Sequence, residues 1–399
     1  MNKAILVALG ALIELTPFGV GQAAAQEVLK IGVSAPKTGP IAGGAAVSYW
    51  PNIKLWTDEI NAAGGLDIGG VKHTIEIIEY DDQSSGETTI QNIQRLASVD
   101  KVDFITSPYS TGINIAAAPI IAQYGYPHIA TTAATDRVAD FATRWPNSFW
   151  VIGTATQLAE GAVKTLVKLR DAGEIDSRLA LVNVADAFGL ELVAAAKPAL
   201  DRAGFEIVYE ASYPLGTQDL APIISAAKAA NPSAFVGFSY PGDTFALTEQ
   251  AQIQNLDVGA FYVGAGTAFP SYVARFGAAV EGILGIGGLN IADPKVADYV
   301  ERHTASAGGK PDFWASATIY AGLQILGQAI EKAGTKDRAA VVEAIRTGTF
   351  NTVLGDVTFV NNVNPNVLTV GQWRDGVFVA VAADGIEVGA EPVRKPGWK

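Results

Sequence analysis

The side chains that could do metal or cofactor chemistry in this chain are few and scattered. Only three histidines occur, at His73, His128 and His303, and there is no cysteine. A metal site needs several ligands held together in a defined geometry, and this spacing does not supply one. We therefore predict no metal and no cofactor, and we expect each histidine to lie on the surface or in a loop.

Catalytic motifs are also missing. The stretch 237–241 (GFSYP) has a proline where the nucleophile elbow Gly-x-Ser-x-Gly needs its last glycine. The Gly-x-Gly pairs at 264–266 and 285–287 do not continue into a dinucleotide-binding pattern and are interpreted as tight turns. The carboxylates of Asp81-Asp82 and Asp186 follow predicted strands, where helix capping and loop solvation explain them. The prediction is a protein that is not an enzyme, with an exported hydrolase as the enzyme alternative.

Groups suited to binding a small molecule are more evident. Hydroxyls and bare amides gather at Tyr109, Ser110, Thr111 and 131–135, just before or after predicted helices and strands. Unpaired N–H groups and the dipole at a helix N-terminus both favour a carboxylate. Aromatic side chains that could cover an apolar ligand occur later in the chain, at Phe188, Tyr240 and Phe269. Ordinary helix capping and core packing are the alternative explanations of the two groups.

The elements that must position these loops alternate between strand and helix. In the first half, Pro36 to Gly44 is predicted to be a loop, and the strands are predicted at 28–34, 74–80, 102–106 and 127–130, with helices at 50–62, 87–97 and 113–123. The alternation restarts after Phe149 and continues to about residue 285. Helices dominate 294–347, and short strands follow within 350–381. This pattern predicts an α/β fold with parallel sheets, in which ligands bind beyond the carboxyl ends of the strands.

Composition and length limit the class of protein. Residues 1–25 have the pattern of an export signal, with Lys3, an apolar run at 4–13, and small residues at 23–25. The run is shorter than the roughly 20 residues that span a bilayer. Without a cysteine to carry a lipid, the prediction is a soluble periplasmic protein. A net charge of −12 with no basic cluster argues against nucleic acid as a partner. The 399 residues predict two domains.

Five segments together give the chain a specific family resemblance. They are LKIGVSAPKTGPIAGG at 29–44, INAAGGLDIGG at 60–70, the stretch 78–111, the stretch 213–236, and the helix 314–330. With these segments the chain resembles the type I periplasmic solute-binding proteins of ABC transporters, the branched-chain amino-acid (leucine/isoleucine/valine)-binding-like family. The resemblance covers nearly the whole chain after the signal.

The resemblance implies two Rossmann-like lobes that are joined by a three-segment hinge and close on a ligand. The first lobe is expected to comprise 26–149 and 286–348, and the second 150–285 and 349–399. Delivery to ABC permease membrane subunits with cytoplasmic ATPases is implied as well. We expect a monomer, with service to a separate signalling receptor as an alternative function.

The resemblance also implies a set of ligand-binding residues. The loop Tyr109-Ser110-Thr111 and the loop around Ala133 and Thr135 would hold the ligand carboxylate. Phe188 would close over the ligand, and Tyr240 and Trp314 would face the cleft. Gly43 and Gly266 complete the predicted set.

One departure from the family pattern bears on the ligand. Amino-acid binders of this family place a carboxylate after the strand that matches 261–264, where it holds the ligand ammonium. Here that loop is Ala265-Gly266-Thr267-Ala268, which has no acid. Because a buried cation without a partner is costly, we expect a carboxylate-bearing, partly apolar ligand, such as an aromatic or short organic acid. A plain amino acid is expected only if Asp186 or Asp243 takes over the missing role.

Overall fold

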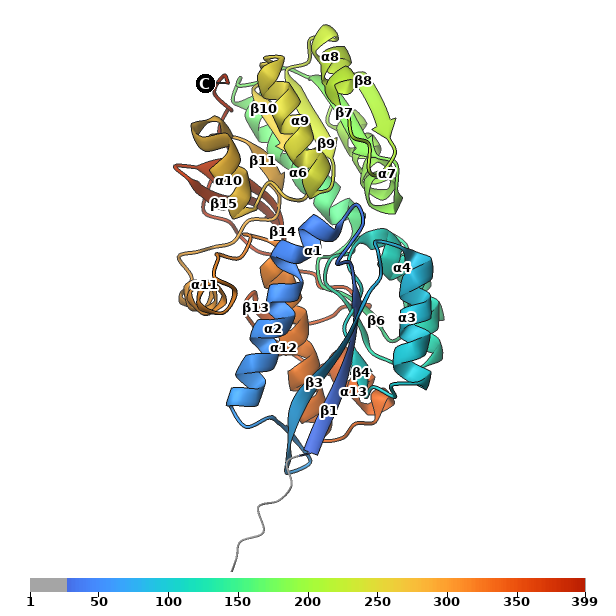
Figure 1. Cartoon of the computed structure of the whole chain (residues 1–399). Helices are drawn as coiled ribbons and strands as arrows, with labels where there is room; N and C mark the ends of the chain where they lie inside the picture. Colours follow the sequence, from blue (N-terminus) through green and yellow to red (C-terminus); the bar gives the residue numbers. More distant parts are fainter. Residues whose placement is uncertain (1–26, 399) are drawn as a thin grey trace, which may run out of the picture.

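The computed structural model describes residues 27–398, so the predicted signal segment 1–25 lies outside the described residues. The chain forms two lobes, one above the other in Figure 1. In the first lobe β1 (Glu27–Ala35) lies between the parallel strands β3 (Val71–Asp81) and β4 (Phe104–Ile105), and β2 (Leu66–Ile68) pairs antiparallel with β3. A separate parallel pair is formed by β5 (His128–Ala130) and β6 (Ser148–Trp150).

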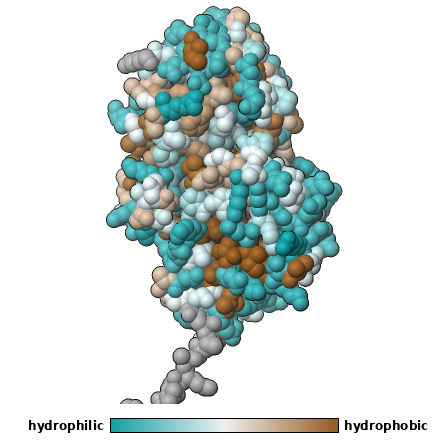
Figure 2. Space-filling model, viewed as in Figure 1, coloured by the Kyte–Doolittle hydropathy of each residue, from teal (hydrophilic) through white to brown (hydrophobic). Residues whose placement is uncertain are grey.

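Helices cover the first-lobe strands because each presents an apolar side to them. They are α1 (Ala42–Ser48), α2 (Trp50–Ala62), α3 (Gly86–Ser98), α4 (Thr111–Gln123) and α5 (Val138–Arg144). The helix α3 illustrates the pattern, since Ser85 caps it by accepting a hydrogen bond from the Thr88 N–H (3.3 Å) and Ile93 and Leu96 are buried. Figure 2 shows a hydrophobic area on this lobe, where α2 and β3 are labelled in Figure 1.

The second lobe is built on one seven-stranded sheet, in the order β15-β14-β11-β10-β9-β7-β8. Its parallel strands are β7 (Arg178–Val184), β8 (Glu206–Tyr213), β9 (Ala234–Phe238), β10 (Ala260–Val263) and β11 (Leu284–Ile286). Two antiparallel strands, β14 (Val367–Arg374) and β15 (Val377–Asp384), complete it. Its helices are α6 (Ala155–Asp171), α7 (Ala187–Arg202), α8 (Ala221–Ala229), α9 (Pro241–Ile253), α10 (Pro270–Phe276) and the 3₁₀ helix Gly277–Val280.

The chain crosses between the lobes three times, at 151–154, 287–293 and 358–366. After the second crossing it adds α11 (Pro294–Ala307), α12 (Ala315–Ala333), α13 (Arg338–Thr347) and the hairpin of β12 (Phe350–Thr352) and β13 (Gly355–Val357). The hairpin bonds to α12, since Gln328 Nε2 donates to the Asn351 carbonyl at 2.9 Å. The chain therefore returns to the second lobe after residue 357 and not at 349. The predicted α/β architecture of two parallel-sheet lobes is confirmed.

Two local expectations were wrong. The predicted loop 36–44 ends in the helix α1, which begins at Ala42 and is too rich in glycine and alanine to show a helical pattern. The three histidines are buried, with exposed fractions of 3% or less. His73 and His128 bond through both ring nitrogens and His303 through one, so their partners within the protein offset the cost of burial.

Within residues 27–398, none of the helices combines the length and the hydrophobicity that a membrane span requires. In the same residues no group of three or more His, Asp or Glu side chains is placed to hold a metal ion.

Candidate ligand-binding cleft between the lobes

A cleft lies where the two lobes meet, beyond the carboxyl ends of the parallel strands. The first lobe contributes Tyr109, Ser110, Thr131, Thr132, Asp312, Trp314 and Ala315, and the second contributes Phe188, Tyr240, Pro241, Ala265, Gly266, Ala268 and Phe269. The cavity measures about 30 Å³, which is space for roughly two water molecules. Helices also touch across it, α1 against α9 and α4 against α7. The two lobes are therefore in a closed arrangement.

The first-lobe wall depends on an unusual backbone conformation at Ser110. This residue precedes α4 and has φ +80° and ψ 155°, a region that residues other than glycine rarely adopt. Asn114, fully buried one turn into α4, holds the loop by donating from Nδ2 to the carbonyls of Pro108 (2.8 Å) and Ser110 (2.7 Å). Thr132 Oγ1 accepts the Ser110 N–H at 3.1 Å. The loop is thus held in place before any ligand arrives.

A buried histidine supports this asparagine. His128 Nε2 donates to Asn114 Oδ1 at 2.8 Å, and Nδ1 accepts from Ser148 Oγ at 3.0 Å. Burial lowers the pKa of His128 to about 3, so the ring is neutral at physiological pH. The two ring bonds fix both the tautomer and the orientation of the asparagine amide. His128 is therefore a structural support of the cleft loop.

The second-lobe wall is an aromatic pair. The rings of Phe188 and Tyr240 stack with centroids 5.1 Å apart. Tyr240 Oη donates to Asp186 Oδ2 at 2.7 Å, while Asp186 Oδ1 caps α7 by accepting the Gly189 N–H at 3.1 Å. Burial and, second, the Asp186 carboxylate raise the pKa of Tyr240 well above its ordinary value. The pair offers a flat apolar face whose polar atoms are already bonded within the protein.

Close backbone contacts explain two glycines near the cleft. Gly266 has φ +98°, and a Cβ there would lie 2.6 Å from the Pro241 Cα, so only glycine fits. A Cβ on Gly44 would lie 2.7 Å from the Tyr109 hydroxyl oxygen and 3.2 Å from Pro241 of the other lobe. Gly43, which was predicted to contact ligand, is exposed and does not line the cleft. The glycine that approaches the cleft is its neighbour Gly44.

Three carboxylates lie in or beside the cleft, and their bonding differs. Asp312 lines it, and both of its carboxylate oxygens accept hydrogen bonds, which come from Trp314 N, Ser316 N and Ser316 Oγ at 2.5–2.9 Å. Asp186 is bonded as described above. Asp243, in the first turn of α9, is 7% exposed, and its Oδ2 has no hydrogen-bond partner within the described chain. Burial raises the pKa of all three, that of Asp243 to about 6.

Helix N-termini converge on the cleft. Residues at the starts of α4, α7, α9 and α12 line it, namely Ser110, Phe188, Pro241 and Ala315. The starts of α7 and α12 carry the carboxylates of Asp186 and Asp312, and α9 has Asp243 in its first turn. The start of α4 has neither a side-chain cap nor an acid in its first turn, so this end is free to attract an anion. Among the described residues that line the cleft, none is Lys, Arg or His.

The structure brings six of the ten predicted residues into one lining, namely Tyr109, Ser110, Phe188, Tyr240, Gly266 and Trp314. Thr111, Ala133 and Thr135 are fully buried just behind it. Thr111 Oγ1 accepts the Ala134 N–H (3.2 Å), and Thr135 Oγ1 donates to Glu191 of α7 (2.8 Å), which joins the two lobes beside the cleft.

Sequence reasoning missed other lining residues. Asp312 belongs to the first lobe but lies far along the chain from that lobe's other loops. Its position two residues before Trp314, at the start of an apolar helix, is a capping pattern that could have identified it. Pro241 lines the cleft through shape alone and no sequence pattern marks it, whereas Ala265 and Ala268 belong to the loop that the family resemblance placed at the ligand.

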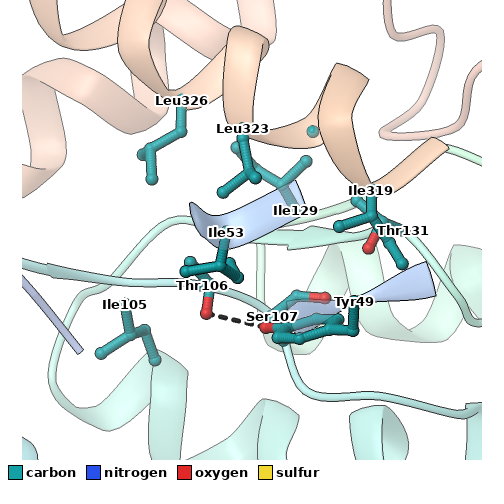
Figure 3. Close-up of a pocket in the computed structure, with 11 residues that line it drawn as sticks. Tyr49, Ile53, Ile105, Thr106, Ser107, Ile129, Thr131, Ile319, Leu323 and Leu326 are labelled. Carbon is teal, nitrogen blue, oxygen red and sulfur yellow. Dashed lines mark hydrogen bonds between the residues drawn. The ribbon is translucent and has the colours of Figure 1, made fainter. Parts of the chain in front are cut away.

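A second small cavity, shown in Figure 3, lies inside the first lobe and is separate from the cleft. Ile53, Ile319 and Leu323 point into it from α2 and α12, and Tyr49 Oη donates to the Ser107 carbonyl at its edge (2.5 Å). The volume is about 20 Å³, enough for one or two water molecules. It is a packing void of the lobe core.

Residues 28–377 match the family model described as periplasmic binding protein. The chain belongs to this family. A Leu/Ile/Val-binding protein homologue of Brucella abortus is 26% identical over 390 residues, covering 92% of this periplasmic binding protein and 94% of the homologue.

Solved structures show the same fold at low sequence identity. The branched-chain amino acid transporter substrate binding protein LivJ of Streptococcus pneumoniae, in complex with isoleucine, superposes with a TM-score of 0.76 and 20% identity, covering 90% of this chain and 99% of that one. An ABC transporter solute binding protein of R. palustris in complex with benzoate gives a TM-score of 0.76 and 19% identity, covering 92% and 99%.

Proposed function

We propose that this protein is the periplasmic receptor of an ABC importer and closes its lobes on a small carboxylate-bearing ligand with an apolar body. The single observation that carries the proposal is the composition of the cleft. The uncapped start of α4 attracts an anion, and the stacked Phe188 and Tyr240 offer an apolar surface in the same lining as Trp314. No catalytic set accompanies these groups, so binding and release, and not turnover, is the proposed activity.

Within this class, an aromatic or short organic acid fits best. The Asp312 and Asp186 carboxylates are already bonded to donors of the protein, and the loop 265–268 has no acid. A ligand ammonium would therefore be desolvated in the cleft without a partner, which is costly. A benzoate-like ligand avoids that cost, because its carboxylate and its ring are the only groups to be placed.

A specific observation favours a second candidate, an amino acid with an apolar side chain. Asp243 Oδ2 is buried without a partner in the described chain and lies in the first turn of α9, which starts at the cleft. If lobe opening or a side-chain rotation brings it to the ligand, it can accept a hydrogen bond from an ammonium group. The two candidates therefore differ in their dependence on this one carboxylate.

Titration of protein that has been unfolded, dialysed and refolded to remove any bound ligand tests the proposal. We expect benzoate to bind, with a change in tryptophan fluorescence because Trp314 lines the cleft. Binding should fall about tenfold or more in Phe188→Ala and stay unchanged in Phe276→Ala, a buried phenylalanine of α10 outside the cleft lining. Binding of leucine or isoleucine that is lost in Asp243→Asn would instead establish the second candidate. If neither benzoate nor these amino acids bind, the proposed ligand class is wrong.

Export and partners follow from the same proposal. We propose that residues 1–25 direct the chain to the periplasm and that the closed form docks on a membrane permease served by cytoplasmic ATPases. Deletion of the gene for this protein should abolish permease-dependent uptake of the ligand found by titration. Unchanged uptake would favour the alternative function as a soluble partner of a signalling receptor.

A further inference from the structure

A cavity much larger than the cleft lies at the hinge. It measures about 520 Å³, against about 30 Å³ for the cleft. Its walls come from all three crossing segments and from the C-terminal stretch 386–390. Figure 1 shows where the chain passes between the lobes, beside α11 and β14. The volume falls within the range of about 300–1,000 Å³ that is typical of small-molecule sites.

The walls of this hinge cavity are mostly aliphatic. Side chains from both lobes and from the crossing segments contribute, among them Ile152, Leu289, Val296, Leu354 and Val379. Two further aliphatic residues are strongly exposed, Ile291 by 37% and Ile386 by 42% of their surface. Apolar side chains that line a cavity and also face water gain free energy when a ligand covers them.

The polar groups of the cavity disfavour an anionic ligand. Among the described residues that line it, none is Lys, Arg or His. The acids are Asp293, which caps α11 by accepting the Lys295 N–H at 2.8 Å, and the exposed Glu387. Asn364 is bonded to the Val151 carbonyl and to Asn366. An anion would lose its hydration here without a cationic partner in return, and it would face the negative charge of these two acids.

One side chain separates the hinge cavity from the cleft. Trp314 lines both. Gly287, at the start of the second crossing, lies against it so closely that a Cβ would be 2.2 Å from the indole ring. A shift of this tryptophan therefore changes the shape of both cavities. A molecule that touches all three crossing segments will also fit the open and the closed hinge differently.

We propose that the hinge cavity is a second binding site, which takes one uncharged lipophilic small molecule and by doing so shifts the balance between open and closed lobes. The binding itself follows from the volume and the aliphatic walls. Its coupling to the cleft rests on the proposed function, because only differential affinity for two states can shift their balance.

The probe for the test is N-phenyl-1-naphthylamine, a neutral dye that fluoresces in apolar surroundings. The purified exported protein should bind one dye molecule per chain in a saturable manner. Ala292→Trp and Ala390→Trp fill the cavity from two of its walls, and each should weaken dye binding by about tenfold or more. Ala305→Trp, at an exposed alanine of α11 outside the cavity, is the matched control and should bind as the parent does.

Three results would overturn the site. The first is that the parent protein shows no saturable dye binding. The second is that both filled variants bind the dye as well as the control does. The third is that the cleft ligand displaces the dye fully and competitively while Phe188→Ala loses dye binding. The use of two filled variants on different walls keeps the test valid if one of them fails to fold.

Coupling is measured separately. With the dye saturating, the dissociation constant of the cleft ligand should change by about threefold or more, and the change should vanish in Ala292→Trp. An unchanged constant would refute the coupling and leave the site. If no cleft ligand is found at all, the proposed function fails while the dye measurements still decide whether the hinge site exists.

Discussion

Replacement of Asn114 by alanine should weaken ligand binding through the loop and not through direct contact. Asn114 does not line the cleft, yet its amide holds the carbonyls of Pro108 and Ser110 and accepts from His128. Without it, the loop can leave the strained conformation at Ser110, where φ is +80°. The hydroxyl of Ser110 and the start of α4 would then no longer be held for the ligand.

The structure sets the size of the stability loss. The Pro108 carbonyl keeps Ser107 Oγ as a donor (3.2 Å), and the Ser110 carbonyl keeps the main-chain N–H of residue 114 (3.1 Å), so each lost bond costs about 1 kcal/mol. The buried Nε2 of His128 loses its only hydrogen-bond partner among the described residues, which costs roughly 1–3 kcal/mol. Relief of the strain at Ser110 returns about 1–3 kcal/mol. The net loss in the free energy of unfolding should be about 2 kcal/mol.

Asn61 provides the matched control. It also makes two side-chain bonds to main chain, donating to the Ile75 carbonyl (3.0 Å) and accepting the Ile75 N–H (2.7 Å), but it lies at the end of α2 away from the cleft. Urea unfolding should show a loss for both alanine variants. Calorimetric titration with the cleft ligand should show a dissociation constant raised about tenfold in Asn114→Ala only. Equal affinity in the two variants would refute the idea that this network organises the ligand loop.

Two further predictions concern hydroxyl and carboxyl groups. Tyr240→Phe removes the hydroxyl that donates to Asp186, and because the freed carboxylate repels an anionic ligand, the affinity measured by titration should fall several-fold. The control Tyr272→Phe loses a buried hydroxyl that pairs with Thr248 outside the cleft lining, and it should bind the ligand normally. Equal affinities in the two variants would contradict this prediction. Asp82 is fully buried, and burial raises its pKa from 3.8 to about 6. Between about pH 4 and 6 the folded state therefore keeps a proton on Asp82 that the unfolded state has lost. The free energy of unfolding should fall as the pH rises through this range. In Asp82→Asn the amide can still pair with Thr89, so this variant should not show the fall. Above about pH 6 its free energy of unfolding in urea should exceed that of the parent by up to about 3 kcal/mol. Parallel pH profiles of the parent and the variant would show that Asp82 does not titrate in this range.

The long elements of the fold were predictable because their patterns are local. Strands such as β1 and β9 are short buried apolar runs, and helices such as α3 and α12 carry an apolar side with recognisable ends. Several short elements were not predicted, namely the three-residue strands β2, β6 and β11. The similarly short β4 and β5 were predicted, because they lie within the strands expected at 102–106 and 127–130. A three-residue strand without such a pattern is selected by the neighbour it pairs with, so its own sequence contains little information.

The cleft was predictable only in part. Residues such as Ser110 and Phe188 follow strands or start helices, so the topology of a parallel α/β sheet places them at the lobe edge. The hydrogen bonding of the three acids could not be predicted from the sequence. Asp186 and Asp312 are bonded to Tyr240 and Ser316, whereas Asp243 Oδ2 has no partner in the described chain, and only the folded chain decides which acid finds a donor.

By itself the sequence determined the α/β class and the order of strands and helices, because hydrophobic periodicity and capping act over a few residues. It also determined that cysteine chemistry is excluded, since the chain has none. The tertiary structure alone decided which glycine approaches the cleft, which carboxylate is left without a donor, and that a large aliphatic cavity lies behind Trp314. These depend on how segments far apart in the chain pack at the hinge, and no local pattern encodes that packing.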